Sequence, residues 1–161
     1  MSTSYRVDFY SPTLPKPTFC LSSHHGCSAK NTPKPRVLLV EDNPLIQKFE
    51  IALLKEMNCI VIVAGTGQEA LDAFHSYYDL IFLDIDLPDM SGLAVATALR
   101  HQKIGAHKIP IIALTAQETD ITFSCLAAGM NEVIAKPLTL KSLKAVLGRY
   151  LPHFSPLSSS Y

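Results

Sequence analysis

Short apolar runs alternate with segments of helical spacing five times along residues 36–147. The first run, Val37–Val40, is followed by Asn43, a helix-capping residue, and by Pro44, which favours the first helical position. Continuous apolar runs of this kind are typical of strands that are buried on both faces. Repeated strand–helix units with short connections predict a doubly wound parallel sheet, because each right-handed crossover lays a helix on the sheet.

Further signals along the chain mark where several of these helices begin or end. Thr66 and Glu69 form a capping-box pattern, and Thr139 is placed to cap the last helix. Asn58 and Gly129 suit the left-handed conformation in which helices often end. The first helix is expected to turn one apolar face inward, made of Ile46, Phe49, Leu53 and Met57. The expected later strands are Cys59–Val63, Leu80–Leu83, Ile109–Leu114 and Val133–Ala135, and a helix is expected over about 117–128.

The composition changes near residue 36. Residues 1–35 carry five prolines and many serine and threonine residues without an apolar period, which predicts a flexible tail or linker. Residues 36–151 are expected to form one domain, and residues 152–161 a frayed C-terminal end. The tail also holds a cluster of thiols and imidazoles whose spacing matches no standard zinc pattern, so we favour chance over a metal site. Its members are Cys20, His24, His25 and Cys27.

The bulk composition narrows the classes of partner. Fourteen basic and fourteen acidic residues cancel among 161, so nothing in the net charge favours nucleic acid or an anionic membrane. No apolar run approaches the roughly 18 residues that a membrane helix needs. The start of the chain lacks the apolar core of a secretory signal, and the cysteines are scattered. We therefore expect no direct binding of nucleic acid, no membrane segment, reduced thiols and a cytoplasmic location.

Polar residues follow four of the expected strands. Glu41 and Asp42 follow the first strand, Asp84 the third, Thr115 the fourth and Lys136 the fifth. The carboxyl ends of parallel strands meet at one edge of a sheet, where ligands bind. The order therefore predicts that three carboxylates, a hydroxyl and an ammonium group converge in one pocket.

These groups fit phosphoryl transfer. Three neighbouring carboxylates repel one another unless a cation lies among them, and hard oxygen ligands suit Mg²⁺. Asp84 is then available as a nucleophile, since carboxylates form acyl phosphates. Mg²⁺ and Lys136 would each neutralise a phosphoryl oxygen, and Thr115 would donate a hydrogen bond to a third.

Four segments resemble the receiver domain of two-component response regulators: Val40–Asn43, Phe82–Gly92, Ala113–Ala116 and Ala135–Leu138. The resemblance runs from about Arg36 to Leu151. It implies a flavodoxin-like fold, with a five-stranded parallel sheet in the order 2-1-3-4-5 flanked by five helices. It implies that Asp84 accepts a phosphoryl group from a histidine kinase or a histidine phosphotransfer protein, with Thr115 and Lys136 at the phosphate-sensing positions.

The resemblance also implies a ligand set for the metal. Asp42 and Asp84 would bind Mg²⁺ directly, together with the backbone carbonyl of Asp86, while Glu41 would act chiefly through water. The bond between Lys136 and Pro137 is expected to be cis. The chain would not be an enzyme beyond catalysing its own phosphorylation and dephosphorylation.

Several positions bear on regulation and partners. Val133 stands where receivers often have an aromatic switch residue, and its surroundings look more like receivers fused to hybrid sensor kinases. Gln117 matches a position that tunes dephosphorylation. Partner specificity is expected at exposed residues of the first helix, such as Gln47, Lys48 and Glu50. A homodimer is possible through the face made by the fourth helix, fifth strand and fifth helix.

Two other functions remain open. Asp84 and Asp86 reproduce the nucleophile and acid/base spacing of haloacid dehalogenase-type phosphohydrolases, although that family places this motif on its first strand and its paired acids later. A pseudo-receiver would keep the fold without the chemistry. The sequence also leaves open whether the chain is a stand-alone regulator or a piece of a hybrid histidine kinase.

Overall fold

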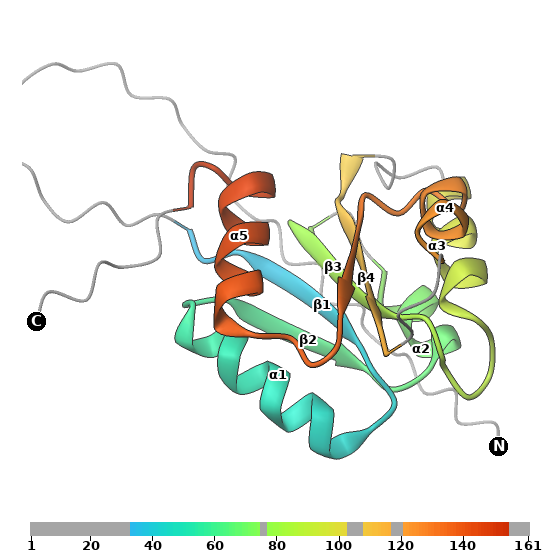
Figure 1. The fold of residues 1–161 in the computed structure, drawn as a ribbon, viewed down its shortest axis with the longest axis horizontal. Coiled ribbons are helices and arrows are strands. Elements are labelled where there is room, and N and C mark those ends of the chain that lie inside the picture. The colour runs from blue at the N-terminus through green and yellow to red at the C-terminus, as the bar shows by residue number, and fades with distance from the viewer. Residues whose placement is uncertain (1–32, 75–76, 103–107, 117–120, 155–161) are drawn as a thin grey trace, which may run out of the picture. The chain divides into compact units, whose positions relative to one another are not determined.

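The computed structural model describes residues 33–74, 77–102, 108–116 and 121–154. Five parallel strands form one sheet in the order β2-β1-β3-β4-β5, which confirms the expected flavodoxin-like topology (Figure 1). The strands are β1 Arg36–Val40, β2 Ile60–Ala64, β3 Leu80–Asp84, β4 Ile111–Thr115 and β5 Glu132–Ala135. The helices are α1 Pro44–Glu56, α2 Gly67–Ala73, α3 Gly92–His101, α4 Thr122–Ala127 and α5 Leu140–Tyr150.

The sheet separates two apolar cores, and alternate residues of each central strand feed one or the other. Val37 and Leu39 of β1 point toward the core that includes Leu54 of α1 and Leu147 of α5. The other core takes the opposite face of β1 and packs against α2, α3 and α4. Figure 1 shows this division, with α1 and α5 on one side of the sheet and α2, α3 and α4 on the other. Helices cover both faces of β1, β3 and β4, which explains why the sequences of these strands are continuously apolar.

The expected helix caps are present, although the capping box predicted at Thr66 and Glu69 forms only in part. The side chain of Asn43 accepts hydrogen bonds from the backbone amides of Leu45 and Ile46, at 2.9 and 3.4 Å, and so caps α1. Thr66 accepts from the amide of Glu69 at 3.1 Å, but the carboxylate of Glu69 accepts from the amide of Gly65 instead of closing the box on Thr66. Asn58, after α1, has a positive φ of 58°. These local choices fix where the chain leaves each helix.

The inward face of α1 differs from the prediction by one position. Phe49, expected in the core, is 50% exposed, whereas Glu50, expected to be exposed for partner specificity, is fully buried. Both predictions were wrong, because the buried face of α1 is centred on Glu50 and Leu54. Lys48 is exposed as expected, and Gln47 is half-buried. An acidic side chain therefore lies under α1 where the sequence predicted a purely apolar contact.

Several predictions fall wholly or partly outside the described residues. These are the helix start near 117, the position Gln117, the four-residue thiol and imidazole cluster, and nearly all of the 1–35 tail. Cys59 and Cys125 are buried free thiols, as expected of small core residues. Within the described ranges no helix combines the length and apolar character needed to cross a membrane.

The turn between α4 and β5 depends on a glycine. Gly129 has a φ of +91°, and an added Cβ would lie 2.8 Å from Cγ of Arg100. The Arg100 guanidinium also donates to the carbonyls of Gly129 and Ile109, each at 2.8 Å, so this side chain is held against the turn. A side chain at position 129 would therefore meet both backbone strain and a steric clash.

We expect Gly129→Ala to lower the free energy of unfolding by roughly 1–3 kcal/mol, the usual cost of a strained left-handed residue. Gly148→Ala is the matched control, because Gly148 lies inside α5 with open space around its Cα. That variant should gain about 0.5–1 kcal/mol from helix propensity. Urea denaturation followed by circular dichroism measures both. Equal stability of the two variants would contradict the role assigned to the turn.

Candidate functional site

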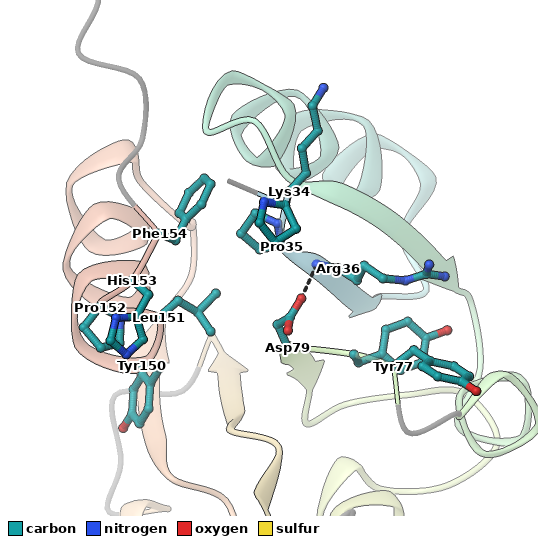
Figure 2. A pocket seen from close by; sticks show the side chains of 12 residues that line it. Lys34, Pro35, Arg36, Tyr77, Asp79, Tyr150, Leu151, Pro152, His153 and Phe154 are labelled. Carbon is teal, nitrogen blue, oxygen red and sulfur yellow. Dashed lines mark hydrogen bonds between the residues drawn. The ribbon is translucent and has the colours of Figure 1, made fainter. Parts of the chain in front are cut away.

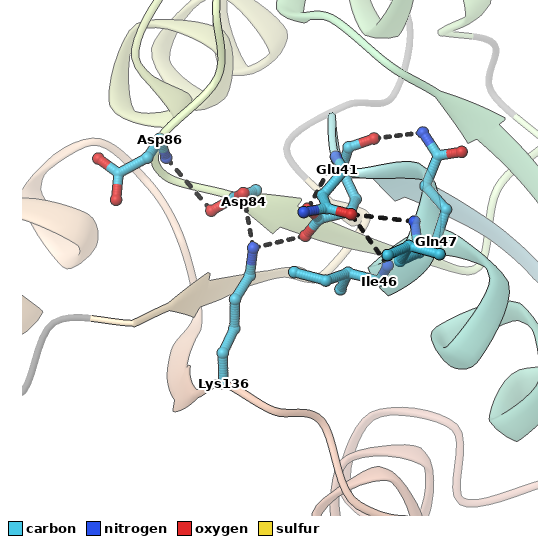
Figure 3. Close-up of polar contacts among 8 residues, drawn as sticks. Glu41, Ile46, Gln47, Asp84, Asp86 and Lys136 are labelled. Atoms are coloured by element: carbon cyan, nitrogen blue, oxygen red, sulfur yellow. Dashed lines mark hydrogen bonds and ion pairs between the residues drawn. The ribbon is translucent and has the colours of Figure 1, made fainter.

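Three acids and a lysine meet at the carboxyl edge of the sheet. Figure 3 shows Lys136 in contact with two of these acids, Glu41 and Asp84. Glu41 and Asp42 follow β1, Asp84 ends β3, and Lys136 follows β5. Because β1 and β3 are neighbours in the sheet, their acids come together: one oxygen from each of the three carboxylates lies within 4.8 Å of the others. The Nζ atom of Lys136 lies 2.5 Å from Oε2 of Glu41 and 2.6 Å from Oδ2 of Asp84. The predicted convergence of the three carboxylates and the ammonium group at this edge is confirmed.

The acids differ in their access to solvent. Glu41 and Asp84 are almost fully buried, while Asp42 is exposed and marks the open side of the cluster. Burial alone would lower the pKa of Lys136, but its hydrogen bonds to Asp84 and Glu41 outweigh burial and raise that pKa above its ordinary value. One ammonium group faces three carboxylates, so the cluster keeps an excess of negative charge. Its oxygen donors and charge fit a hard divalent cation such as Mg²⁺.

Thr115 lies at the same edge of the sheet. It is the last residue of β4, it is 3% exposed, and it pairs in register with Ala135 of β5. Its carbonyl accepts a hydrogen bond from the amide of Lys136 at 2.7 Å. The backbone therefore holds Thr115 beside Lys136. The peptide bond that follows, between Lys136 and Pro137, is cis as expected.

The loop after Asp84 folds closely against the end of β3. The amide of Asp86 donates to Oδ1 of Asp84 at 3.2 Å, and the amide of Gly92 donates to the carbonyl of Ile85 at 2.8 Å. A Cβ at position 92 would lie 2.2 Å from the carbonyl oxygen of Asp84, so only glycine allows this approach. The side chain of Asp86 is exposed. Metal binding by the carbonyl of Asp86 stays a prediction.

Asp89 is a contributor that the sequence analysis did not single out. Its carboxylate accepts hydrogen bonds from the amides of Gly67 and Gln68, at 2.8 and 2.9 Å, at the start of α2. These backbone hydrogen bonds lower the pKa of Asp89 below its ordinary value. Asp89 therefore ties the loop that follows Asp84 to a second helix. In the sequence, Asp89 lies close to the start of α3, where a carboxylate signals at most a local helix cap. Its partners Gly67 and Gln68 lie 22 and 21 residues earlier in the chain.

Glu50 is the second residue missed. It is 0% exposed, and neither of its carboxylate oxygens has a hydrogen-bond partner among the described residues. Burial, and after it the charge of Glu41, raises the pKa of Glu50 to about 7. Beside it lies a cavity of about 440 Å³ lined by Leu45, Ile46, Phe49, Glu50, Ala116, Lys136 and Pro137. The cavity joins the buried acid to the lysine of the site.

A larger cavity, of about 670 Å³, lies where β1 and β3 begin, at the edge of the sheet opposite Asp84 (Figure 2). Aromatic and apolar side chains line much of it, including Tyr77, Tyr150 and Phe154. Among its described lining residues Asp79 is the single acid, and its carboxylate accepts from the amide of Arg36 at 2.7 Å. This cavity lacks the grouped acids of the Asp84 edge, so we place the candidate site at the carboxyl ends of the strands.

The buried Glu50 should make stability depend on pH. Its folded pKa of about 7 exceeds the ordinary value of 4.5, so the folded state binds the proton more tightly than the unfolded chain does. This contribution is fully present below about pH 4.5 and is lost as the pH rises through about 7. Without metal, the unfolding free energy of the wild type should fall by roughly 2 kcal/mol relative to Glu50→Gln between pH 5 and pH 8.

Urea denaturation in EDTA at the two pH values measures this difference. Glu56→Gln, which removes an exposed acid from the same helix, is the control and should follow the wild type. Parallel pH profiles for the wild type and Glu50→Gln would show that Glu50 keeps no excess proton in the folded state.

Comparison with known proteins agrees with this geometry. The family model for the response regulator receiver domain matches residues 37–148. The transcription factor SKN7 of Chaetomium thermophilum is 38% identical over 125 residues, which cover 74% of this chain and 16% of that protein. The aerobic respiration control sensor protein ArcB of Escherichia coli is 38% identical over 119 residues, covering 73% of this chain and 15% of ArcB. The chain thus spans about one sixth of the length of these relatives.

Solved structures show the same fold. The receiver domain of the sensor histidine kinase PA1611 from Pseudomonas aeruginosa, which has a magnesium ion coordinated in its active site cleft, matches with a TM-score of 0.68 and 34% identity. The match covers 74% of this chain and 98% of that one. The receiver domain of Ssk1, solved with the histidine phosphotransfer protein Ypd1 of Saccharomyces cerevisiae, matches with a TM-score of 0.66 and 26% identity over 80% of this chain and 96% of that one. The match to the family model, the sheet order and the acids gathered around Lys136 all agree: the chain belongs to the response regulator receiver family.

Proposed function

We propose that Asp84 accepts a phosphoryl group from the phosphohistidine of a histidine kinase or a histidine phosphotransfer protein. The observation that carries this proposal is the position of the Asp84 carboxylate, 2.6 Å from Lys136 and within 4.8 Å of two further acids. Relatives support it, since ArcB is a sensor protein and the Ssk1 receiver was solved with a histidine phosphotransfer protein. The chain then acts in two-component or phosphorelay signalling.

The reaction follows from the groups present. An oxygen of the Asp84 carboxylate forms a bond to phosphorus while the bond between phosphorus and the donor's imidazole nitrogen breaks, and the imidazole leaves. Lys136 balances the negative charge on the phosphoryl oxygens, and Thr115 donates a hydrogen bond to one of them. Glu41, Asp42, Asp84 and the carbonyl of Asp86 would hold Mg²⁺, which supplies further charge neutralisation when bound.

The phosphohydrolase alternative is less consistent with the fold. In that family, as described above, the nucleophile lies on the first strand and the paired acids come later, whereas here Asp84 ends β3 and the paired acids follow β1. Sustained turnover of a phosphomonoester would favour the hydrolase. Labelling that stops at one phosphoryl group per chain favours the receiver.

Substitution of Asp84 tests the acceptor assignment. With radiolabelled acetyl phosphate and Mg²⁺, the wild type should be labelled, while Asp84→Asn should lose at least about nine tenths of the label because the nucleophilic carboxylate is gone. EDTA should also suppress labelling of the wild type. Asp86→Asn is the control, since it changes an exposed carboxylate two residues away and leaves the backbone carbonyl in place. Labelling that survives in Asp84→Asn would place the acceptor elsewhere.

We also propose that the exposed part of α1 belongs to the surface that contacts the phosphodonor. Leu45 is 74% exposed and Phe49 is 50% exposed, and both line the cavity that Lys136 borders. A protein that brings its phosphohistidine to Asp84 must cover the surface beside the site, and exposed apolar side chains there favour such a contact. Because Glu50 is buried, we assign the partner contact that was expected there to the exposed side chains of Leu45 and Phe49.

The double variant Leu45→Ala/Phe49→Ala should slow transfer from a phosphorylated histidine phosphotransfer protein by about tenfold or more, because truncating central apolar contacts commonly costs 1–2 kcal/mol or more. Labelling by acetyl phosphate, which needs no docking surface, should be unchanged. Phe123→Ala removes a residue of α4 that is 79% exposed and should leave both reactions at the wild-type rate. Equal loss in the α1 and α4 variants would argue against a docking role specific to α1.

The wider setting of the chain is also proposed. We propose that residues 36–151 form the receiver, with a flexible tail before it and a frayed end after it, and that it works in the cytoplasm. Its relatives include sensor proteins and a transcription factor that are far longer, so fusion to a hybrid kinase and service as a separate regulator both fit.

Beyond a signalling role, we propose that its catalysis is limited to its own phosphorylation and dephosphorylation. A homodimer through α4, β5 and α5 stays a prediction, as does any switch that uses the half-buried Val133.

A further inference from the structure

Glu50 is a fourth acid near the site, and the chemistry proposed for Asp84 does not use it. It lies on the inward face of α1, it is 0% exposed, and both carboxylate oxygens lack a hydrogen-bond partner among the described residues. Burying an unpaired carboxylate costs several kcal/mol, so an unpaired carboxyl in such a place keeps its proton unless a positive charge compensates it. An acid in this position therefore responds to the charge around it.

The charges that act on Glu50 come from three strand ends. Glu41 after β1 and Asp84 at the end of β3 both favour the protonated carboxyl, and Lys136 after β5 favours the ionised form. Among the described residues that line the adjoining cavity, Lys136 and Glu50 itself are the charged ones. Two negative charges thus oppose one positive charge, and that positive charge is already engaged by Glu41 and Asp84. Coulomb interactions fall only with the inverse of distance, so these groups act on Glu50 without touching it.

We propose that Glu50 is the charge-balancing residue of the acidic site, keeping a proton while the site is empty and releasing it when a divalent cation binds Glu41, Asp42 and Asp84. The inference rests on the proposed Mg²⁺ site. Two added positive charges reverse the balance that Glu50 experiences. The O–H bond of the carboxyl then breaks, the proton passes to solvent, and the negative charge stays on the carboxylate beside Lys136. The neutral, metal-free form explains how α1 tolerates an acid on its buried face.

Linkage gives the sign of the effect. A cation that favours the ionised carboxyl must bind more tightly as the pH rises, because less free energy is then spent on removing the proton. The pKa of about 7 in the metal-free protein puts this change in the neutral range. Between pH 6 and pH 8 the dissociation constant for Mg²⁺ should therefore fall by about tenfold in the wild type, which is the largest change that one group with a metal-free pKa of about 7 can give over this range.

Isothermal titration calorimetry with MgCl₂ at pH 7, in buffers of different ionisation enthalpy, counts the protons released. The wild type should release on the order of half a proton per Mg²⁺, since Glu50 is about half protonated at a pH equal to its pKa. Glu50→Gln, a neutral side chain of the same shape, should release almost none, and its Mg²⁺ affinity should change less than twofold between pH 6 and pH 8. Glu56→Gln should behave as the wild type, because it removes an exposed acid of α1.

A second measurement needs no substitution. The ¹³C shift of the Glu50 side-chain carboxyl should titrate near neutral pH without metal and at a clearly lower pH with saturating Mg²⁺. Unchanged proton release in Glu50→Gln, or an unshifted Glu50 titration when Mg²⁺ is bound, would overturn the inference while leaving the metal site intact. Failure of the wild type to bind Mg²⁺ would instead overturn the metal site and, with it, this inference.

Discussion

The ammonium group of Lys136 lies between two buried carboxylates that would otherwise repel each other, and much of the molecule serves to keep these three groups together. Glu41 directly follows β1 and Asp84 ends the neighbouring β3, so the sheet itself brings these two acids close together. Lys136 arrives from β5, two strands away from β3, and its side chain spans that distance to contact both acids. Because three segments far apart in sequence meet in one ion-pair cluster, the cluster forms only when the strands are ordered as they are.

The position of β1 in the sheet explains why the site occurs at this edge. The chain places β2 on one side of β1 and β3 on the other, so the connections after β1 and β3 leave toward opposite faces. At the carboxyl ends lies a cavity lined by the exposed Asp42 and by residues 85–91, the loop that follows β3. Topological switch points of this kind are where doubly wound sheets bind ligands. The same arrangement leaves the opposite edge with a cavity that has a different lining, aromatic and without grouped acids.

The parallel sheet and the meeting of Asp84, Thr115 and Lys136 at one edge could be predicted from the sequence, because they depend on repeated apolar runs and on which residues end them. The order of the strands was predicted only through the resemblance to receiver domains. The face of α1 that is buried could not be predicted. Phe49 and Glu50 are neighbours in α1. By residue type and helical spacing, the apolar Phe49 is expected to face the core and the charged Glu50 to face solvent. In the structure Glu50 is buried and lines the cavity that Lys136 also borders. The role of Asp89 could not be predicted either, because its hydrogen-bond partners Gly67 and Gln68 belong to a helix that is distant in sequence.

The loop between Asp84 and α3 has little freedom in its length. Within eight residues the chain must pair Asp86 with Ser91, reach α2 through Asp89, and return so that Gly92 lies against the carbonyl of Asp84. An inserted residue would displace at least one of these contacts, and a deleted residue would pull Asp89 away from α2. A displacement of the backbone at Asp84 would be passed to the starts of α2 and α3 together. Loops commonly tolerate changes in length, but this one joins an acid to two helices and is as constrained as the sheet it leaves.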